Sequence, residues 1–174
     1  DPLPTDPDWA GGSLYTDHRA RRTDADPHAV WTVLEGIGGQ HGWYSFGPGW
    51  AVRGWLDRLF GGVGLRRGRR DTGRLRLGDV VDFWRVEAID RERLLRLRAE
   101  MRLPGPAWLE WRIGRDREGR TVLLQRAVFH PHGLAGHAYW WSVFPFHAFV
   151  FKGMTRNITR TAERLSRDGR RDTD

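Results

Sequence analysis

The chain has 174 residues, enough for one domain around a single core, and its lack of Cys excludes disulfides, a thiol nucleophile and Cys-ligated zinc or iron–sulfur sites. Its net charge of +7 comes from Arg spread along the chain and interleaved with Asp and Glu, so we expect no specific binding of nucleic acid. No run approaches eighteen apolar residues, and the start of the sequence lacks the basic and apolar regions of a signal peptide, so we expect a cytoplasmic protein that does not bind membranes.

The first elements expected along the chain are a linker, an edge strand and a short helix. Residues 1–12 are rich in Pro, Asp and Gly, which is typical of a linker or tail. The mixed polar and apolar residues of 13–23 predict an edge strand. A helix is expected to begin at Asp26 and Pro27, because Asp caps free amides and Pro suits the first helical position. Apolar residues then recur at helical spacing until Gly38, where we expect the helix to end.

The middle of the chain predicts a second short helix and then a sheet. In residues 50–60, Trp and Leu fall on neighbouring faces of a helix. Four segments rich in strand-forming residues follow, joined by short connections of hairpin type: 79–89, 93–103, 107–114 and 121–129. In the second of these segments, apolar residues alternate with Arg and Glu, which is typical of a strand with one solvated face. The four segments therefore predict an antiparallel meander.

A long helix is expected from about residue 134 to 166, because apolar side chains recur there at spacings of three and four. Pro145 lies inside this pattern and is expected to kink the helix or split it in two. Residues 167–174 are charged and are expected to be a disordered tail. The element order predicts one α+β domain over residues 13–166, in which two short helices and a long, kinked C-terminal helix accompany a curved antiparallel sheet.

Five segments resemble a known family: Gly38–Tyr44 (GGQHGWY), 53–70, 78–87, 97–105 and 130–141 (HPHGLAGHAYWW). Over residues 13–165 the chain is similar to a START/SRPBCC-type domain of unknown function that follows NAD(P)-binding, short-chain-dehydrogenase-like (epimerase-like) domains in bacteria. The resemblance implies a helix-grip fold with an internal cavity, and it implies no established reaction. It also implies that residues 1–12 link this domain to a preceding NAD(P)-binding domain. The chain itself has no GxGxxG motif, and we expect it to use no cofactor.

His147 is the first candidate for chemistry, because it falls within the apolar stripe of the predicted C-terminal helix and is expected to face the sheet. Asp82 and Glu110 are the carboxylates on predicted strands that could join it in general acid–base work. Asp82 and Arg85 fall on opposite faces of an ideal strand, so at most one of them is expected to line a cavity with His147. The alternative is a buried histidine satisfied by one structural hydrogen bond.

A second set of candidates would line a cavity, because ligand pockets combine apolar and aromatic walls with a few polar groups. The candidate ligand-binding residues are Trp43, Tyr44, Arg53, Trp84, Met101, Trp108, Gln125, Tyr139, Trp140, His147 and Phe151. A cavity lined by a subset of them is expected to hold a small hydrophobic or aromatic molecule. Most of the aromatic residues are expected to serve the core as well.

The glycine-rich segment 61–70 carries Arg66, Arg67, Arg69 and Arg70, which could grip a phosphate or carboxylate or dock a partner domain. The alternative is a solvated basic loop paired with nearby acids. His130 and His132 lie two residues apart, but no carboxylate stands at a metal-ligand spacing beside them, so we expect no metal site.

Three functions follow from these features. The leading hypothesis is a small-molecule-binding domain that acts as the C-terminal accessory domain of a larger oxidoreductase-like protein. The second is a cavity enzyme of cyclase, hydrolase or isomerase type that uses His147 with a carboxylate. The third is an interaction domain that docks through the Arg-rich loop.

Overall fold

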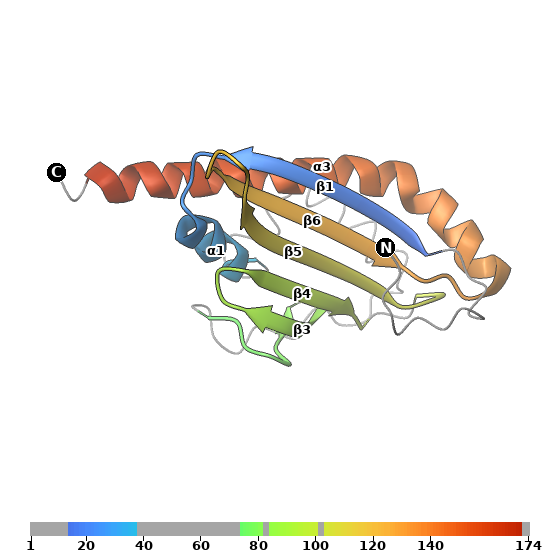
Figure 1. Ribbon diagram of the computed structural model, residues 1–174. Coiled ribbons are helices and arrows are strands. Elements are labelled where there is room, and N and C mark those ends of the chain that lie inside the picture. The colour runs from blue at the N-terminus through green and yellow to red at the C-terminus, as the bar shows by residue number, and fades with distance from the viewer. Residues whose placement is uncertain (1–13, 38–73, 82–83, 101–102, 172–174) are drawn as a thin grey trace.

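In the computed structural model, which describes residues 14–37, 74–81, 84–100 and 103–171, a long helix runs along one face of a six-stranded antiparallel sheet (Figure 1). The elements in chain order are β1 (Tyr15–Thr23), α1 (Pro27–Glu35), β2 (Val80–Val81), β3 (Trp84–Asp90), β4 (Leu94–Ala99), β5 (Ala107–Arg115), β6 (Thr121–Phe129) and α3 (Gly133–Arg171). The strands lie in the order β1-β6-β5-β4-β3-β2, so the predicted meander and the predicted edge strand are both confirmed.

The segment expected as a single strand over residues 79–89 forms two paired strands instead. Val80 of β2 lies opposite Arg85 of β3, and Val81 lies opposite Trp84. The backbone of Val86 explains the fold-back, because its carbonyl accepts from the Gly78 amide and its own amide donates to the Asp79 carbonyl, each at 2.8 Å. Residues 50–60, expected as a second helix, lie outside the described residues, as do the predicted linker 1–12 and the end of the predicted tail.

Asp26 caps α1 as expected and also ties it to α3. One carboxylate oxygen of Asp26 accepts from the Ala29 amide at 2.8 Å, and the other accepts from the Ser166 hydroxyl at 2.6 Å. The Ser166 hydrogen bond, followed by that of Ala29, lowers the pKa of the Asp26 carboxyl. The helix ends at Glu35, with Gly36 as its cap, whereas the sequence predicted its end at Gly38.

Helix α3 is continuous from Gly133 to Arg171, so Pro145 does not split it. Figure 1 shows that the helix bends in its N-terminal half, the half that contains Pro145. Proline removes one helical hydrogen bond and crowds the preceding turn, which is the usual cause of such a bend. The helix continues beyond Ser166, and Arg170 and Arg171 in its last turn suit the negative end of the helix dipole.

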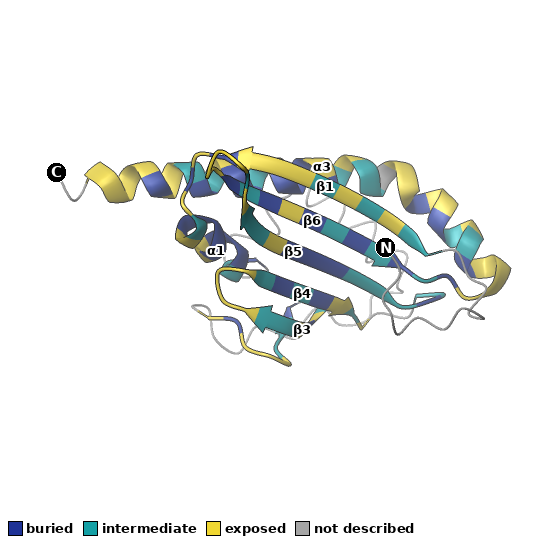
Figure 2. Cartoon of the chain, viewed as in Figure 1, coloured by how far each residue is buried: buried dark blue, intermediate teal, exposed yellow. Residues whose placement is uncertain are grey.

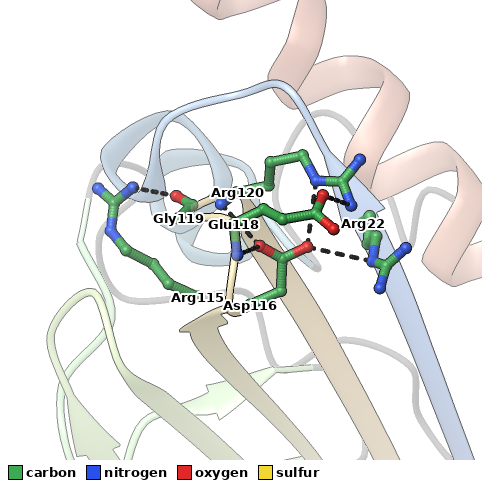
Figure 3. Close-up of polar contacts among 6 residues, drawn as sticks. All are labelled: Arg22, Arg115, Asp116, Glu118, Gly119 and Arg120. Atoms are coloured by element: carbon green, nitrogen blue, oxygen red, sulfur yellow. Dashed lines mark hydrogen bonds and ion pairs between the residues drawn. The ribbon is translucent and has the colours of Figure 1, made fainter.

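Asp116 organises the β5–β6 hairpin and joins it to the edge strand (Figure 3). One of its carboxylate oxygens accepts from the amides of Glu118 and Arg120, each at 2.9 Å. The other lies 3.1 Å from Nε of Arg120 and 3.2 Å from Nε of Arg22 on β1. The hairpin therefore holds β1 in place at the end where β6 begins.

The core lies between the sheet and the two described helices, α1 and α3. Figure 2 shows buried residues along β4, β5, β6 and α1, whereas β1 is mostly exposed or intermediate. The buried core residues that β4, β5 and β6 contribute to this cluster are Leu95, Leu97, Leu109, Trp111, Leu123 and Ala127. They meet Val30 and Leu34 of α1 and Met154 and Ile158 of α3. We call the sheet face toward α3 the inner face.

Candidate ligand-binding site

Gln125, in the middle of β6, shows which side chains belong to the inner face. Its side-chain oxygen accepts from Nε1 of Trp111 at 2.9 Å and from the hydroxyl of Thr155 at 3.1 Å. Its amide nitrogen donates to the carbonyl of Phe151 at 3.3 Å. Gln125 and Trp111 thus face α3. Because these hydrogen bonds of Gln125 join two strands to the helix, its role is mainly structural.

His147 lies on α3 between two aromatic residues that the sequence also singled out. Its ring stacks on that of Phe151 with centroids 5.2 Å apart and meets Trp140 edge-on at 6.1 Å. Its Nδ1 atom is fully buried and has no hydrogen-bond partner among the described residues. Burial lowers the pKa of His147 to about 4, while the charge of Asp17 acts in the opposite direction. His147 is therefore neutral at pH 7.

Asp17 and Arg19 bring charge to the inner face from β1. Asp17 lies opposite Ala127, and Arg19 lies opposite Gln125, so both share the face of those inward residues. Nη2 of Arg19 donates to the Asp17 carboxylate at 2.7 Å. Nε of Arg19 is buried without a hydrogen-bond partner in the described part of the chain. The pair therefore places two opposite charges on the inner face, and the Nε–H group of Arg19 remains without an acceptor in the described part of the chain.

Aromatic rings close one end of this region. Tyr15 on β1 stacks on Trp140 with centroids 4.8 Å apart, and its hydroxyl bonds Nδ1 of His137 at 2.9 Å. Phe129 stacks on the same Trp140 at 5.8 Å and contacts Tyr139 at 5.7 Å. Burial raises the pKa of the Tyr139 hydroxyl, which therefore stays protonated at neutral pH. We define the β1 site as Asp17, Arg19, Trp140, His147 and Phe151.

Two sequence candidates lie on the opposite, outer face of β5. Glu110 and Trp108 alternate with the inward Leu109 and Trp111. Burial alone would raise the pKa of Glu110, but hydrogen bonds from Arg112 at 2.7 Å and Arg96 at 2.7 Å outweigh it and lower the pKa. The structure therefore does not bring Glu110 together with His147, and Trp108 cannot contact a molecule held under α3.

The remaining sequence candidates divide between the core and the part of the chain outside the described residues. Trp84 of β3 is partly buried and packs on the core. The candidates outside the described residues are Trp43, Tyr44, Arg53, Arg66, Arg67, Arg69, Arg70, Asp82 and Met101. Within the described ranges, no three His, Asp or Glu side chains form a group that could hold a metal ion. No helix in that part of the chain is long and apolar enough to cross a membrane.

Sequence reasoning missed Asp17 and Arg19. The alternation of residues 15–23 places Tyr15, Asp17 and Arg19 on one face, and that signal was available once the strand was predicted. Both faces of this strand are polar, however, so hydrophobicity alone does not indicate which one faces the core.

Comparison with known proteins identifies the family and the fold. The model of a family described as "Protein of unknown function (DUF2867)" matches residues 9–154. A sequence search of curated proteins finds no match.

Several solved structures are similar to this chain at low sequence identity. Truncated norcoclaurine synthase from Thalictrum flavum is 14% identical, with a TM-score of 0.52 over 86% of this chain and 93% of the synthase. The ZhuI aromatase/cyclase from Streptomyces sp. R1128 is 16% identical, with a TM-score of 0.52 over 87% of this chain and 95% of the cyclase. SA2116 of Staphylococcus aureus, a protein of unknown function, is 10% identical, with a TM-score of 0.52 over 90% of this chain and 98% of its own. These likenesses confirm the predicted α+β helix-grip fold.

Proposed function

We propose that this chain, which belongs to the family of proteins of unknown function DUF2867, binds a small hydrophobic or aromatic molecule between α3 and the inner face of the sheet. The observation that carries the proposal is the buried Nδ1 atom of His147. It lacks a hydrogen-bond partner among the described residues, although buried polar groups are normally hydrogen-bonded. The rings of Trp140 and Phe151 flank the His147 ring, and aromatic walls with a few polar groups are typical of ligand sites.

Calorimetric titration with three naphthalene derivatives of similar size tests this function: 2-acetonaphthone, 2-naphthoate and 2-isopropenylnaphthalene. The wild-type chain is expected to bind at least one of them saturably. The Ala127→Leu variant adds bulk to the inner face opposite Asp17 and is expected to weaken binding by at least about tenfold. Val128→Leu changes the next residue, on the outer face, and is expected to leave binding unchanged.

The proposed function is contradicted if the wild-type chain binds none of the three compounds. Equal weakening by Ala127→Leu and Val128→Leu would also contradict it, because the binding surface would then not be the inner face. Circular dichroism at the titration temperature checks that both variants are folded, since added bulk in a packed region costs about 1–3 kcal/mol.

An enzyme of cyclase type is the second candidate, favoured by the charge of Asp17 near the His147 ring. General bases work best when their pKa lies near the operating pH, and the pKa of His147 is about 4. The Asp17 carboxylate is already held by Arg19 at 2.7 Å. These groups suit hydrogen bonding to a ligand better than proton transfer at pH 7, so binding is the better-supported function.

The finer assignment, an accessory domain that follows an NAD(P)-binding domain, is supported by the sequence resemblance alone. The Arg-rich residues 66, 67, 69 and 70 would be its docking contacts. Charge reversal at these four Arg is expected to weaken association with such a domain while leaving the titration with naphthalene derivatives unchanged. Unchanged association after charge reversal would contradict docking through this segment.

A further inference from the structure

The inner face changes from polar to apolar across the sheet, and this gradient orients any molecule held there. Asp17 at the β1 edge lies opposite Ala127, which lies opposite Leu109 on β5, which in turn lies opposite Leu97 on β4. Ala127, Leu109 and Leu97 are buried members of the core. The methyl group of Ala127 is the smallest side chain in this row. A ligand at the site would therefore place its polar end at β1 and its apolar body toward β5.

Two buried donors at the polar end lack an acceptor. Nε of Arg19 carries a hydrogen, and it has no acceptor among the described residues. His147 is neutral at pH 7, and in the tautomer with the hydrogen on Nδ1 it offers a second buried donor. Asp17 pairs with Arg19, and its charge acts on His147. The His147 ring also contacts Trp140, which stacks on Tyr15 of the same strand, so both donors lie toward the β1 edge.

The charges facing this end balance. Asp17 neutralises Arg19 through the 2.7 Å ion pair. The next inward residue of β1 is Arg21, which donates to the hydroxyl of Thr159. Thr23, the inward residue after it, donates to Glu163, which brings a negative charge to the same edge. Asp17 and Glu163 offset the charges of Arg19 and Arg21, so a carboxylate on a ligand would meet the Asp17 carboxylate with no net positive charge to attract it. An uncharged oxygen acceptor avoids that repulsion and still satisfies both donors.

We propose that Arg19 and His147 together bind an uncharged carbonyl oxygen at the polar end of the ligand, while its apolar body lies over Ala127 and Leu109. This inference rests on the proposed function, because it names the chemical class of molecule held at the same site. A site of this kind is expected to bind aromatic ketones and related carbonyl compounds more tightly than aromatic acids or aromatic hydrocarbons.

The naphthalene derivatives separate these classes, because they differ mainly in the polar group. The wild-type chain is expected to bind 2-acetonaphthone at least about tenfold more tightly than 2-isopropenylnaphthalene, which replaces the carbonyl oxygen with a methylene group. A similar preference is expected over 2-naphthoate. Equal affinities, or a preference for 2-naphthoate, would overturn the inference while leaving the proposed function intact. Binding of none of the three would overturn the function itself.

The Asp17→Asn variant tests the role of charge balance. It leaves the charge of Arg19 uncompensated, so the affinity for 2-naphthoate is expected to rise about tenfold or more relative to the affinity for 2-acetonaphthone. Glu118→Gln makes the same change in net charge at the exposed β5–β6 turn and is expected to alter neither affinity. An unchanged affinity of Asp17→Asn for 2-naphthoate would overturn the charge argument.

Arg19→Met provides a second variant should Asp17→Asn fail to fold. The Met side chain is of similar length but carries no N–H donor, so the preference for 2-acetonaphthone over 2-isopropenylnaphthalene is expected to fall at least about fivefold. A preference that survives in Arg19→Met would show that the carbonyl oxygen is bound elsewhere and would overturn the assignment of Arg19.

Discussion

The protonation of His147 links the β1 site to the stability of the whole fold. The unfolded chain takes up a proton on His147 near pH 6.5, whereas burial lowers the pKa in the folded chain to about 4. Between these values the unfolded state binds more protons, so His147 makes the folded state less stable as the pH falls from 6.5 to 4. Above pH 6.5 both states are neutral and this contribution to stability is fully present.

Replacement of His147 by Leu is expected to remove this part of the pH dependence. Between pH 7 and pH 5, the free energy of unfolding of the variant should fall by about 2 kcal/mol less than that of the wild-type chain. Urea unfolding at the two pH values measures the difference. The same loss of stability in both proteins would show that His147 is not buried as a neutral group.

His28 is the matched control, because its shift has the opposite sign. The hydrogen bond with Glu92 raises the pKa of His28, so its contribution to stability is present at low pH and is lost as the pH rises through the folded value. His28→Gln should therefore increase the stability lost between pH 7 and pH 5, where His147→Leu should reduce it.

Glu110 offers a test of which sheet face carries function. Glu110→Gln removes a carboxylate that is almost fully buried between Arg96 and Arg112, and it is expected to lower the free energy of unfolding by about 1–3 kcal/mol. Binding of 2-acetonaphthone should be unchanged, because the side chain points away from α3. A loss of binding without a loss of stability would contradict this placement and would show that Glu110 contributes to ligand binding.

At the residue scale, part of the proposed site could be predicted from the sequence, and the rest could not for a physical reason. His147, Trp140 and Phe151 were predictable because they recur at helical spacing among apolar residues. Asp17 and Arg19 were not, because which polar face of β1 turns inward depends on its pairing with β6. That pairing joins residues more than a hundred positions apart, so the local alternation places Asp17 and Arg19 on one face without indicating that this face turns inward.

At the element scale, the start of α3 depends on close backbone contacts. A Cβ on Gly136 would lie 2.7 Å from the carbonyl oxygen of Pro104 and 2.8 Å from Cα of Pro131. Ala normally favours a helix, but here it is expected to lower the melting temperature by several degrees, because backbone would have to move. Differential scanning calorimetry measures the shift.

Gly169→Ala, in the same helix, is the control for Gly136→Ala. A Cβ there meets no atom within 4 Å, so the substitution is expected to stabilise the chain by up to about 1 kcal/mol. Stabilisation by both substitutions would contradict the tight contact between the start of α3 and the loop at Pro104.

The strands from β4 to β6 were predictable because apolar residues alternate along them and short turns join them. The division into β2 and β3 was not, since it depends on the bonds of Val86 to Gly78 and Asp79 across the sheet edge. The end of α1 was predicted too far along the chain for a related reason. Gly36 caps the helix through backbone bonds that a count of apolar residues does not register.

At the scale of the whole molecule, the fold brings together parts of the chain that lie far apart in sequence. The β1 site combines residues 17 and 19 with residues of α3, and Asp26 joins α1 to Ser166 near the other end of that helix. The site therefore forms only when the first strand and the last helix pack on the same sheet.

A crystal structure of the chain with 2-acetonaphthone is the most direct test of that site. The naphthalene ring is expected between α3 and the inner face, with its carbonyl oxygen within hydrogen-bond distance of Arg19 Nε and His147 Nδ1. A probe seated on the outer face beside Trp108, or an inner face that stays closed at saturating probe, would contradict a ligand site beneath α3.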